Sequence, residues 1–273
     1  MAPATDSAPL AVCFALLGAC VGSFLNLVAW RLPRRQSVIL PGSHCIRCGQ
    51  GLAWFDNIPL LGWLLLAGRC RYCGAGISSR YPLVELLCAG LWVLQLQTHR
   101  GSWAALLAGL LFSGQLLVLA LIDMDTMWLP EPLCRWGLLA GLLLTPILAA
   151  LEGGDPLRQT MGHGFAALMG LLCLEAVSGL GQLALGVPAL GLGDAKLAAM
   201  LGAWLGGRGL ASAVLLAVFS AALVGVVGRL SGRLAAYQPF PFGPFLALAG
   251  MVLWCGGETL ANGLLGLVLA GLI

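Results

Sequence analysis

Long apolar runs make up most of this sequence, and they restrict the possible folds more than any other feature. About 20 consecutive apolar residues cross the hydrocarbon core of a bilayer as one helix. Hydrophobic residues form 60% of the chain and charged residues only 9%, whereas soluble domains carry about 25% charged residues. We therefore predict an all-α polytopic membrane protein embedded in the lipid bilayer, with about eight transmembrane helices. The predicted spans are roughly 8–30, 82–98, 103–122, 133–150, 160–182, 195–207, 210–228 and 244–257.

Two of the later apolar runs are too short to be ordinary spans. The run at 195–207 is short and is bounded by Arg208. The final stretch, GLLGLVLAGLI at 263–273, fits either a ninth half-span or an interfacial helix. The net charge of +3 gives no reason to expect nucleic acid as a partner, because in a membrane protein the positions of the basic residues carry the information.

The distribution of basic residues predicts the orientation of the chain. Lys and Arg concentrate in the cytoplasmic loops of membrane proteins. With the N-terminus outside, eleven of the 14 basic residues fall on the inner side. We therefore expect the polar segment 31–81 in the cytoplasm, and Asp123 and Asp194 at the cytoplasmic border. The outer side then carries only Arg100, Arg158 and Arg208.

Two CxxC pairs lie in the polar segment, CIRC at 45–48 and CRYC at 70–73. A CxxC turn lets two sulfurs approach one metal ion, and a second pair completes a tetrahedron. Disulfides are not expected on the reducing side of the membrane. The pattern predicts a structural zinc site, since four protein ligands leave no open position for catalysis; the alternative is four unrelated free cysteines. The predicted ligands are Cys45, Cys48, Cys70 and Cys73.

Aspartates stand at the borders of two predicted spans, Asp123 and Asp125 in LALIDMDTMWLPEPL and Asp194 in ALGLGDAKLAAM. An ionisable group at such a depth is a functional candidate. Two carboxylates brought together can share one proton, so that one activates a water while the other donates to a peptide carbonyl. Gly191 and Gly193 would let a substrate backbone approach in an extended form. Spacing alone does not decide between Asp123 and Asp125.

The other interpretation of these aspartates is structural. Asp194 precedes a helical run, where Asp is a good N-cap. Lys196 and Arg135 are basic residues that could pair with the aspartates at the interface. Glu175 lies inside the predicted span 160–182, and we expect it to be a packed or hydrogen-bonded residue rather than a catalytic one.

Several ordered motifs together make the chain resemble the type IV prepilin peptidases, the bifunctional leader peptidase and N-methyltransferase enzymes of pilus and type II secretion systems. These enzymes are GxGD aspartic membrane proteases, and the resemblance runs over nearly the whole chain. Besides the two CxxC pairs, the matching stretches are GSFLNLVAWRLP (22–33), DNIPLLGWLLLAGRCRYCGAGISSRYPLVE (56–85), IDMDTMWLPE (122–131), GLGDAKLAAMLGAW (191–204) and PFGPFLALAG (241–250).

The resemblance implies a function and assigns site residues. Asp123 matches the first catalytic aspartate of the family and Asp194 the second, whereas Asp125 matches an acidic position that is not the principal catalytic one. The four CxxC cysteines match the metal-binding cysteines. The family cleaves the short basic leader from prepilins or pseudopilins at the cytoplasmic face of the bacterial inner membrane, after a glycine. It then methylates the new N-terminus with S-adenosylmethionine.

The chain departs from the family pattern at two places. The family usually has Lys-Glu-Gly-Met just before GxGD, and here residues 187–190 read VPAL. This change removes charges near the expected site and bears on efficiency or substrate preference more than on mechanism. The Leu-Pro-Asp of the family becomes Leu-Pro-Glu, ending at Glu131, which keeps a carboxylate.

The methyl-donor site has little support from the residues themselves. No GxGxxG pattern stands between a strand and a helix, so a Rossmann site for the cofactor is not visible. Gly22 and Asn26 in GSFLN are candidates, with small-residue helix packing as the alternative. PFGP at 241–244 could line the same cleft as the aspartates, with a plain helix start as the alternative.

We expect three parts in the chain: the first transmembrane helix at 1–30, the cytoplasmic zinc loop at 31–81 and the protease core at 82–273. Two other functions remain open alongside the peptidase. A proton-coupled transporter would also use intramembrane carboxylates, although no repeat between the halves is evident. An inactive member of the same family is the other alternative.

Overall fold

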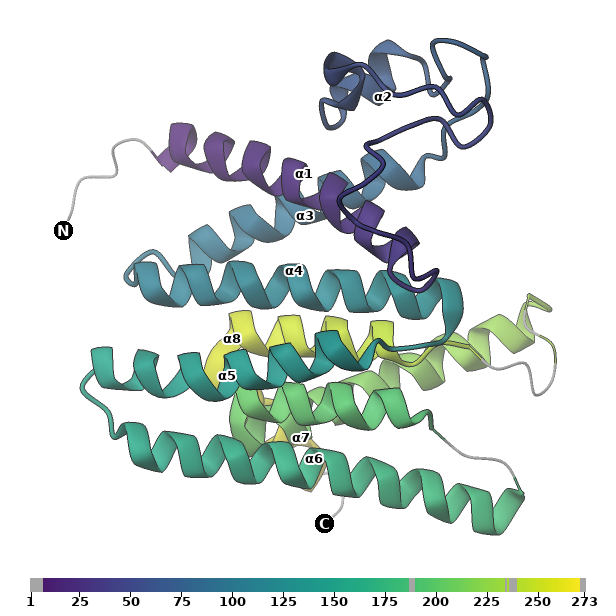
Figure 1. Ribbon diagram of the computed structural model, residues 1–273. Helices are drawn as coiled ribbons and strands as arrows, with labels where there is room; N and C mark the ends of the chain where they lie inside the picture. Colours follow the sequence, from purple (N-terminus) through teal and green to yellow (C-terminus); the bar gives the residue numbers. More distant parts are fainter. Residues whose placement is uncertain (1–6, 187–189, 234, 236–239, 271–273) are drawn as a thin grey trace. The chain divides into compact units, whose positions relative to one another are not determined.

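The computed structural model describes residues 7–186, 190–233, 235 and 240–270, and these residues form an all-helical protein (Figure 1). Most of the VPAL segment therefore lies outside the described residues. Within the described part the extended backbone pairs only at two isolated bridges, His44 with Gly51 and Arg69 with Gly76. The elements are α1 (Ser7–Arg31), the 3₁₀ helix η1 (Trp54–Asn57), α2 (Leu61–Leu65), α3 (Arg80–Thr98), α4 (Trp103–Thr126), α5 (Glu131–Leu151), α6 (Pro156–Leu185), α7 (Leu192–Leu230) and α8 (Gly243–Ala270).

The helices confirm a multi-pass membrane protein but do not confirm the count of eight spans. Among the described residues, six helices are long and apolar enough to cross a membrane: α1, α4, α5, α6, α7 and α8. Helix α3 covers the predicted span 82–98 but is not among these six. Helix α7 takes up two predicted spans, 195–207 and 210–228.

Helix α7 is broken at Gly206, whose φ of 67° and ψ of −177° are not helical. Its first turn carries Asp194, whose carboxylate interacts electrostatically with Asp123. Near its other end, the space above Gly225 is filled by the Phe240 ring, which lies just before the start of α8. Because Asp123 is itself bonded to that start, both ends of α7 approach the same region. The chain therefore turns back on itself at Gly206, as two consecutive spans would require.

Helix α8 has a similar break at Gly257, with φ 61° and ψ −164°. The break coincides with the end of the predicted span 244–257. The stretch 263–273, for which two interpretations were open, continues as helix to Ala270. Its last residues, 271–273, lie outside the described part of the chain.

The chain divides into two compact units, Met1–Val118 and Leu119–Ile273. In the first unit, α1 packs closely along α3 because glycines replace larger side chains at their contact. A Cβ at Gly18 would lie 2.9 Å from the Cα of Ala89, and one at Gly22 would lie 2.9 Å from the Cα of Glu85. Small residues of this kind allow helix backbones to approach in a membrane, where van der Waals packing replaces the hydrophobic driving force. The predicted division at residues 30 and 81 stays a prediction.

The second unit is centred on the first half of α7, which α5, α6 and α8 surround. Trp204 is 2% exposed, and its indole N–H donates to the carbonyl of Gly137 in α5 at 2.8 Å. Gly202 presses on the backbone of α6, since a Cβ there would lie 2.6 Å from the Ala166 carbonyl. This packing holds the N-terminal turn of α7 in a fixed place.

Candidate active site and metal centre

The two predicted catalytic aspartates lie at the ends of different helices of the second unit. Asp123 is in the last turn of α4, and Asp194 is in the first turn of α7. Both are buried, with 5% and 8% of their surface exposed. Asp125, two residues from Asp123, is exposed. Burial therefore distinguishes two residues that spacing could not.

A backbone N–H at the start of α8 holds the carboxylate of Asp123. Gly243 N donates to Asp123 Oδ2 at 2.9 Å, in a buried bond between residues 120 positions apart. A Cβ at Gly243 would lie 2.7 Å from the same oxygen, so only glycine fits at this distance. The start of a helix also carries partial positive charge, which favours a carboxylate there. PFGP is thus both a helix start and part of the aspartate site.

Asp194 is held by its own helix start. Gly191 N donates to Asp194 Oδ2 at 3.1 Å, and Gly191 is the N-cap residue of α7. The expected open space at Gly193 is not there, because a Cβ at this position would lie 2.8 Å from the Leu129 Cβ. Gly193 serves the packing of the Leu-Pro-Glu loop onto α7 rather than an approach by substrate, so that part of the interpretation of GxGD was wrong.

The two carboxylates lie near enough to interact electrostatically. Each has one oxygen bonded to a backbone N–H, from Gly243 for Asp123 and from Gly191 for Asp194. Two like charges brought together in a buried place favour a state in which the pair shares one proton. Such a pair has the composition needed for general acid–base catalysis.

The basic residue near Asp194 pairs with a different acid. Lys196 Nζ lies 2.8 Å from Glu131 Oε2, so the carboxylate of Leu-Pro-Glu ties the start of α5 to the start of α7. An ion pair between Lys196 and Asp194, one of the structural alternatives, does not form in this arrangement. Glu175 is exposed on α6, and the expectation that it would be packed was wrong.

The four CxxC cysteines come together in the loop of the first unit. The Sγ atoms of Cys45, Cys48, Cys70 and Cys73 all lie within 4.8 Å of one another. The separation of Cys45 Sγ and Cys73 Sγ is 3.8 Å. A tetrahedral zinc ion with Zn–S bonds of about 2.3 Å has its sulfur atoms about 3.8 Å apart. The cluster therefore fits a metal ion of zinc's size and geometry.

The two halves of the cluster have the same local structure. In the first, Gly49 N donates to the Cys45 carbonyl at 2.8 Å; in the second, Gly74 N donates to the Cys70 carbonyl at 2.9 Å. Both glycines have positive φ, 71° and 70°, where a side chain would strain the turn. Each turn is closed by one of the two isolated β-bridges. The repeated turn is what aims two sulfurs of each pair at one point.

Backbone hydrogen bonds at the first CxxC turn favour the thiolate form of Cys45. The backbone N–H groups of Cys48 and Arg47 lower the pKa of the Cys45 thiol to about 6, because they stabilise its thiolate. A thiolate is the form that binds a metal. Beside the second pair, Arg71 Nε donates to Asp56 Oδ2 at 2.9 Å, and this bond holds the pKa of Asp56 below its usual value. The same pair ties the second turn to η1.

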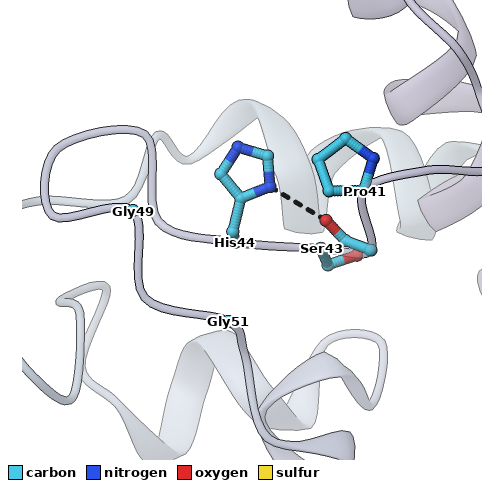
Figure 2. A pocket seen from close by; sticks show the side chains of 6 residues that line it. Pro41, Ser43, His44, Gly49 and Gly51 are labelled. Carbon is cyan, nitrogen blue, oxygen red and sulfur yellow. Dashed lines mark hydrogen bonds between the residues drawn. The ribbon is translucent and has the colours of Figure 1, made fainter.

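An open hollow adjoins the first CxxC turn (Figure 2). The His44 ring lies over it, with Nδ1 2.9 Å from the carbonyl of Gly42. Pro41, Ser43 and three glycines form the rest of its wall. Its lining residues include no carboxylate, and His44 is the one side chain among them that can carry a charge.

The GSFLN residues take part in helix packing. Gly22 lies against the backbone of α3, and Asn26, 5% exposed, is directed at the carbonyl of Tyr81 with Nδ2 at 3.4 Å. This arrangement favours the packing interpretation over a role in binding the methyl donor. The sequence analysis named the PFGP stretch but gave Gly243 itself no role. The sign that could have identified it is a glycine at a helix start, within a stretch that also matched the family.

Two protein-family models together match most of the chain. The model of the Bacterial Peptidase A24 N-terminal domain matches residues 16–98, and that of the Type IV leader peptidase family matches residues 110–226. A prepilin leader peptidase/N-methyltransferase of Myxococcus xanthus is 42% identical over 239 residues, covering 85% of this chain and 69% of the relative. No solved structure matches the chain.

With other relatives, the matched region covers a larger share of the relative's own chain. A prepilin leader peptidase/N-methyltransferase of Aeromonas salmonicida is 37% identical over 279 residues, with 93% of each chain covered. The type 4 prepilin-like proteins leader peptide-processing enzyme of Escherichia coli is 37% identical over 254 residues, covering 86% of this chain and 89% of the relative. With the matches to both family models, these identities show that the chain belongs to the type IV leader peptidase family.

Proposed function

We propose that this chain is a membrane-embedded aspartic endopeptidase that removes the basic leader from type IV prepilins or type II secretion pseudopilins and then methylates the new N-terminus. The names of its relatives support both activities. The observation that carries the peptidase is the convergence of two buried aspartates, Asp123 and Asp194, from α4 and α7. Both lie in the part of the chain matched by the leader peptidase model.

The proposed mechanism uses the two carboxylates with one proton between them. The charged carboxylate takes a proton from a water molecule, whose oxygen attacks the scissile peptide carbonyl. The protonated carboxyl donates to the carbonyl oxygen as the tetrahedral intermediate forms. Gly243 N and Gly191 N each occupy one carboxylate oxygen, which leaves the second oxygen of each aspartate for the water and the substrate.

The proposed substrate geometry follows from the membrane. A prepilin has an apolar helix behind a short basic leader, so its helix would lie in the bilayer against the enzyme and its leader would stay in the cytoplasm. The Lys and Arg distribution supports an inner-membrane protein with its N-terminus outside and both the metal loop and the aspartates at the cytoplasmic side. The peptide bond to be cut then falls beside Asp123 and Asp194.

For the methyl transfer we propose S-adenosylmethionine as the donor, which supplies an electrophilic methyl group to the new amino terminus. The packing of Gly22 and Asn26 against α3 argues against these two residues as its site. For the cysteine cluster we propose zinc, held by all four thiolates. Its role is to fold the loop, since a complete set of protein ligands leaves no coordination position for a substrate.

Leader cleavage by purified enzyme in nanodiscs tests the peptidase. Asp123→Asn and Asp194→Asn are each expected to lower cleavage by a factor on the order of 10⁴, because removing one member of a catalytic unit costs nearly as much as removing all of it. The matched control is Asp125→Asn, an exposed acid two positions away, which should keep most of the activity. Cleavage that survives either of the first two substitutions would exclude the two-carboxylate mechanism. Labelled S-adenosylmethionine in the same reaction reports methylation separately.

A further inference from the structure

Helix α2 presents an apolar face that none of the described residues of the first unit covers. Leu61, Leu64 and Leu65 are 55%, 62% and 80% exposed. Their spacing of three and four residues places them on one side of the helix. Three large apolar side chains exposed together on one side of a helix mark a surface that binds something apolar.

The opposite side of α2 is fixed to the loop, so the leucines cannot turn inward. Gly62 is buried, and a Cβ at this position would overlap the carbonyl of Asp56. Trp63 donates its indole N–H to the carbonyl of Ile77 at 3.1 Å. The exposed face is therefore a fixed feature of the folded loop.

A hydrogen bond sets the depth of α2 relative to the membrane-crossing helix α1. Leu60 N, just before α2, donates to Glu85 Oε2 in α3 at 2.7 Å. The backbone of Glu85 lies against Gly22 of α1, nine residues before α1 ends at Arg31. At 1.5 Å per residue this is about 14 Å along the helix from its end. The start of α2 is thus tied, through Glu85, to the part of α3 that packs against the membrane-crossing helix α1.

The charge of the loop complements an anionic surface. Segment 31–81 has one acidic residue, Asp56, and that residue is paired with Arg71. An apolar helix face within a basic segment is the combination that binds at the boundary between headgroups and acyl chains. The basic residues of the segment are Arg31, Arg34, Arg35, Arg47, Arg69, Arg71 and Arg80.

We propose that α2 is an interfacial helix, which inserts Leu61, Leu64 and Leu65 into the anionic lipid surface on the loop's own side of the membrane. The metal-binding loop is then held at the membrane by three attachments: α1, α3 and the leucine face. The leucine face fixes the height of the loop above the bilayer, which the connections of the loop to α1 and α3 alone would leave free to vary. The inference stands apart from the peptidase activity and does not use it.

The test places the photoreactive residue p-benzoylphenylalanine at position 65 of the full-length protein in nanodiscs containing phosphatidylglycerol. Irradiation followed by mass spectrometry of the peptides identifies what the face touches. We expect lipid adducts at position 65, several-fold above those with the same residue in place of Gln50, an exposed position in the first CxxC turn. A background carrying Leu61→Glu and Leu64→Glu should reduce the adduct to the Gln50 level while the metal content stays unchanged.

Two outcomes would overturn the proposal. Crosslinks from position 65 to peptides of residues 119–273 would mean that the rest of the chain covers the face. Lipid adducts no more frequent at position 65 than at position 50 would mean that the face is in water. Metal content measured on each variant identifies a loop that has failed to fold, and a second probe at Leu64 repeats the test without altering position 65.

Discussion

The cysteine cluster and the aspartate pair are both small groups of polar side chains, but they are built in opposite ways. The four cysteines come from two short turns with the same local structure, each held by backbone hydrogen bonds between residues close in sequence. The two aspartates come from α4 and α7, and the nearest partner of Asp123 is on α8. The first cluster depends on local chain geometry, whereas the second depends on how long helices pack.

This difference predicts how each cluster responds to mutation. Changes in the loop should remove the metal and leave the helices of the second unit intact. Changes in the glycine contacts of the second unit should weaken the aspartate site and leave the metal in place.

The largest effect is expected for Cys70→Ser, because Cys70 is the one buried cysteine of the cluster. Binding of a structural zinc ion contributes about 10–16 kcal/mol to the fold around it. The variant should lose its metal, measured by elemental analysis, and its loop should become sensitive to trypsin at the arginines of segment 31–81. Cys173→Ser, an exposed cysteine on α6, should behave as wild type. Zinc retained in the Cys70 variant would contradict the four-thiolate site.

The next effect is expected for Gly243→Ala, which tests whether α8 positions Asp123. The added methyl group would meet Asp123 Oδ2 at 2.7 Å, so the carboxylate must move. A shift of about 1 Å in a catalytic group costs about 100-fold in rate, equal to about 2.7 kcal/mol. We expect kcat for leader cleavage to fall while KM changes little. An effect on KM alone would assign Gly243 to substrate binding instead.

A smaller effect on stability is expected for Gly202→Ala. Alanine gains up to about 1 kcal/mol in helix propensity, but its Cβ would lie 2.6 Å from the Ala166 carbonyl in α6. Overpacking of this kind costs about 1–3 kcal/mol, so the contact should outweigh the propensity. The melting temperature in detergent should fall, with zinc content unchanged. Gly164→Ala on α6, where a Cβ meets nothing within 4 Å, should leave the melting temperature unchanged or raise it.

The smallest effect is expected for Lys196→Gln. The side chains of Lys196 and Glu131 are 37% and 62% exposed, and ion pairs at such sites contribute about 1 kcal/mol or less. The variant should fold normally and cleave at a rate close to wild type. Glu131→Gln should reproduce the same small change, and the double substitution should add little to either one. A large loss of activity in only the Lys196 variant would give Lys196 a role beyond this pair.

Sequence patterns predicted the loop better than the core. The CxxC spacing led directly to the four ligands, because residues three apart in a tight turn meet wherever the turn forms. The apolar runs predicted the helices for a similar reason, since each run depends on its own residues. The reversal at Gly206 also agrees with the predicted boundary between the spans 195–207 and 210–228, because Arg208 interrupts the apolar run there.

Tertiary contacts were needed for everything that depends on which way a helix faces. The exposed position of Glu175 and the burial of Asp123 rather than Asp125 follow from the rotation of α6 and α4 against their neighbours. In a sequence that is apolar on every face, no periodicity reveals that rotation.

The sequence by itself determined that this chain crosses a membrane repeatedly and carries four cysteines able to hold one metal ion, because both properties arise within short stretches of chain. Only the tertiary structure decided which aspartates are buried and that Gly243 holds Asp123 in place. The contact between Gly243 and Asp123 joins residues 120 positions apart, and it forms because glycine has no Cβ that would collide with the carboxylate.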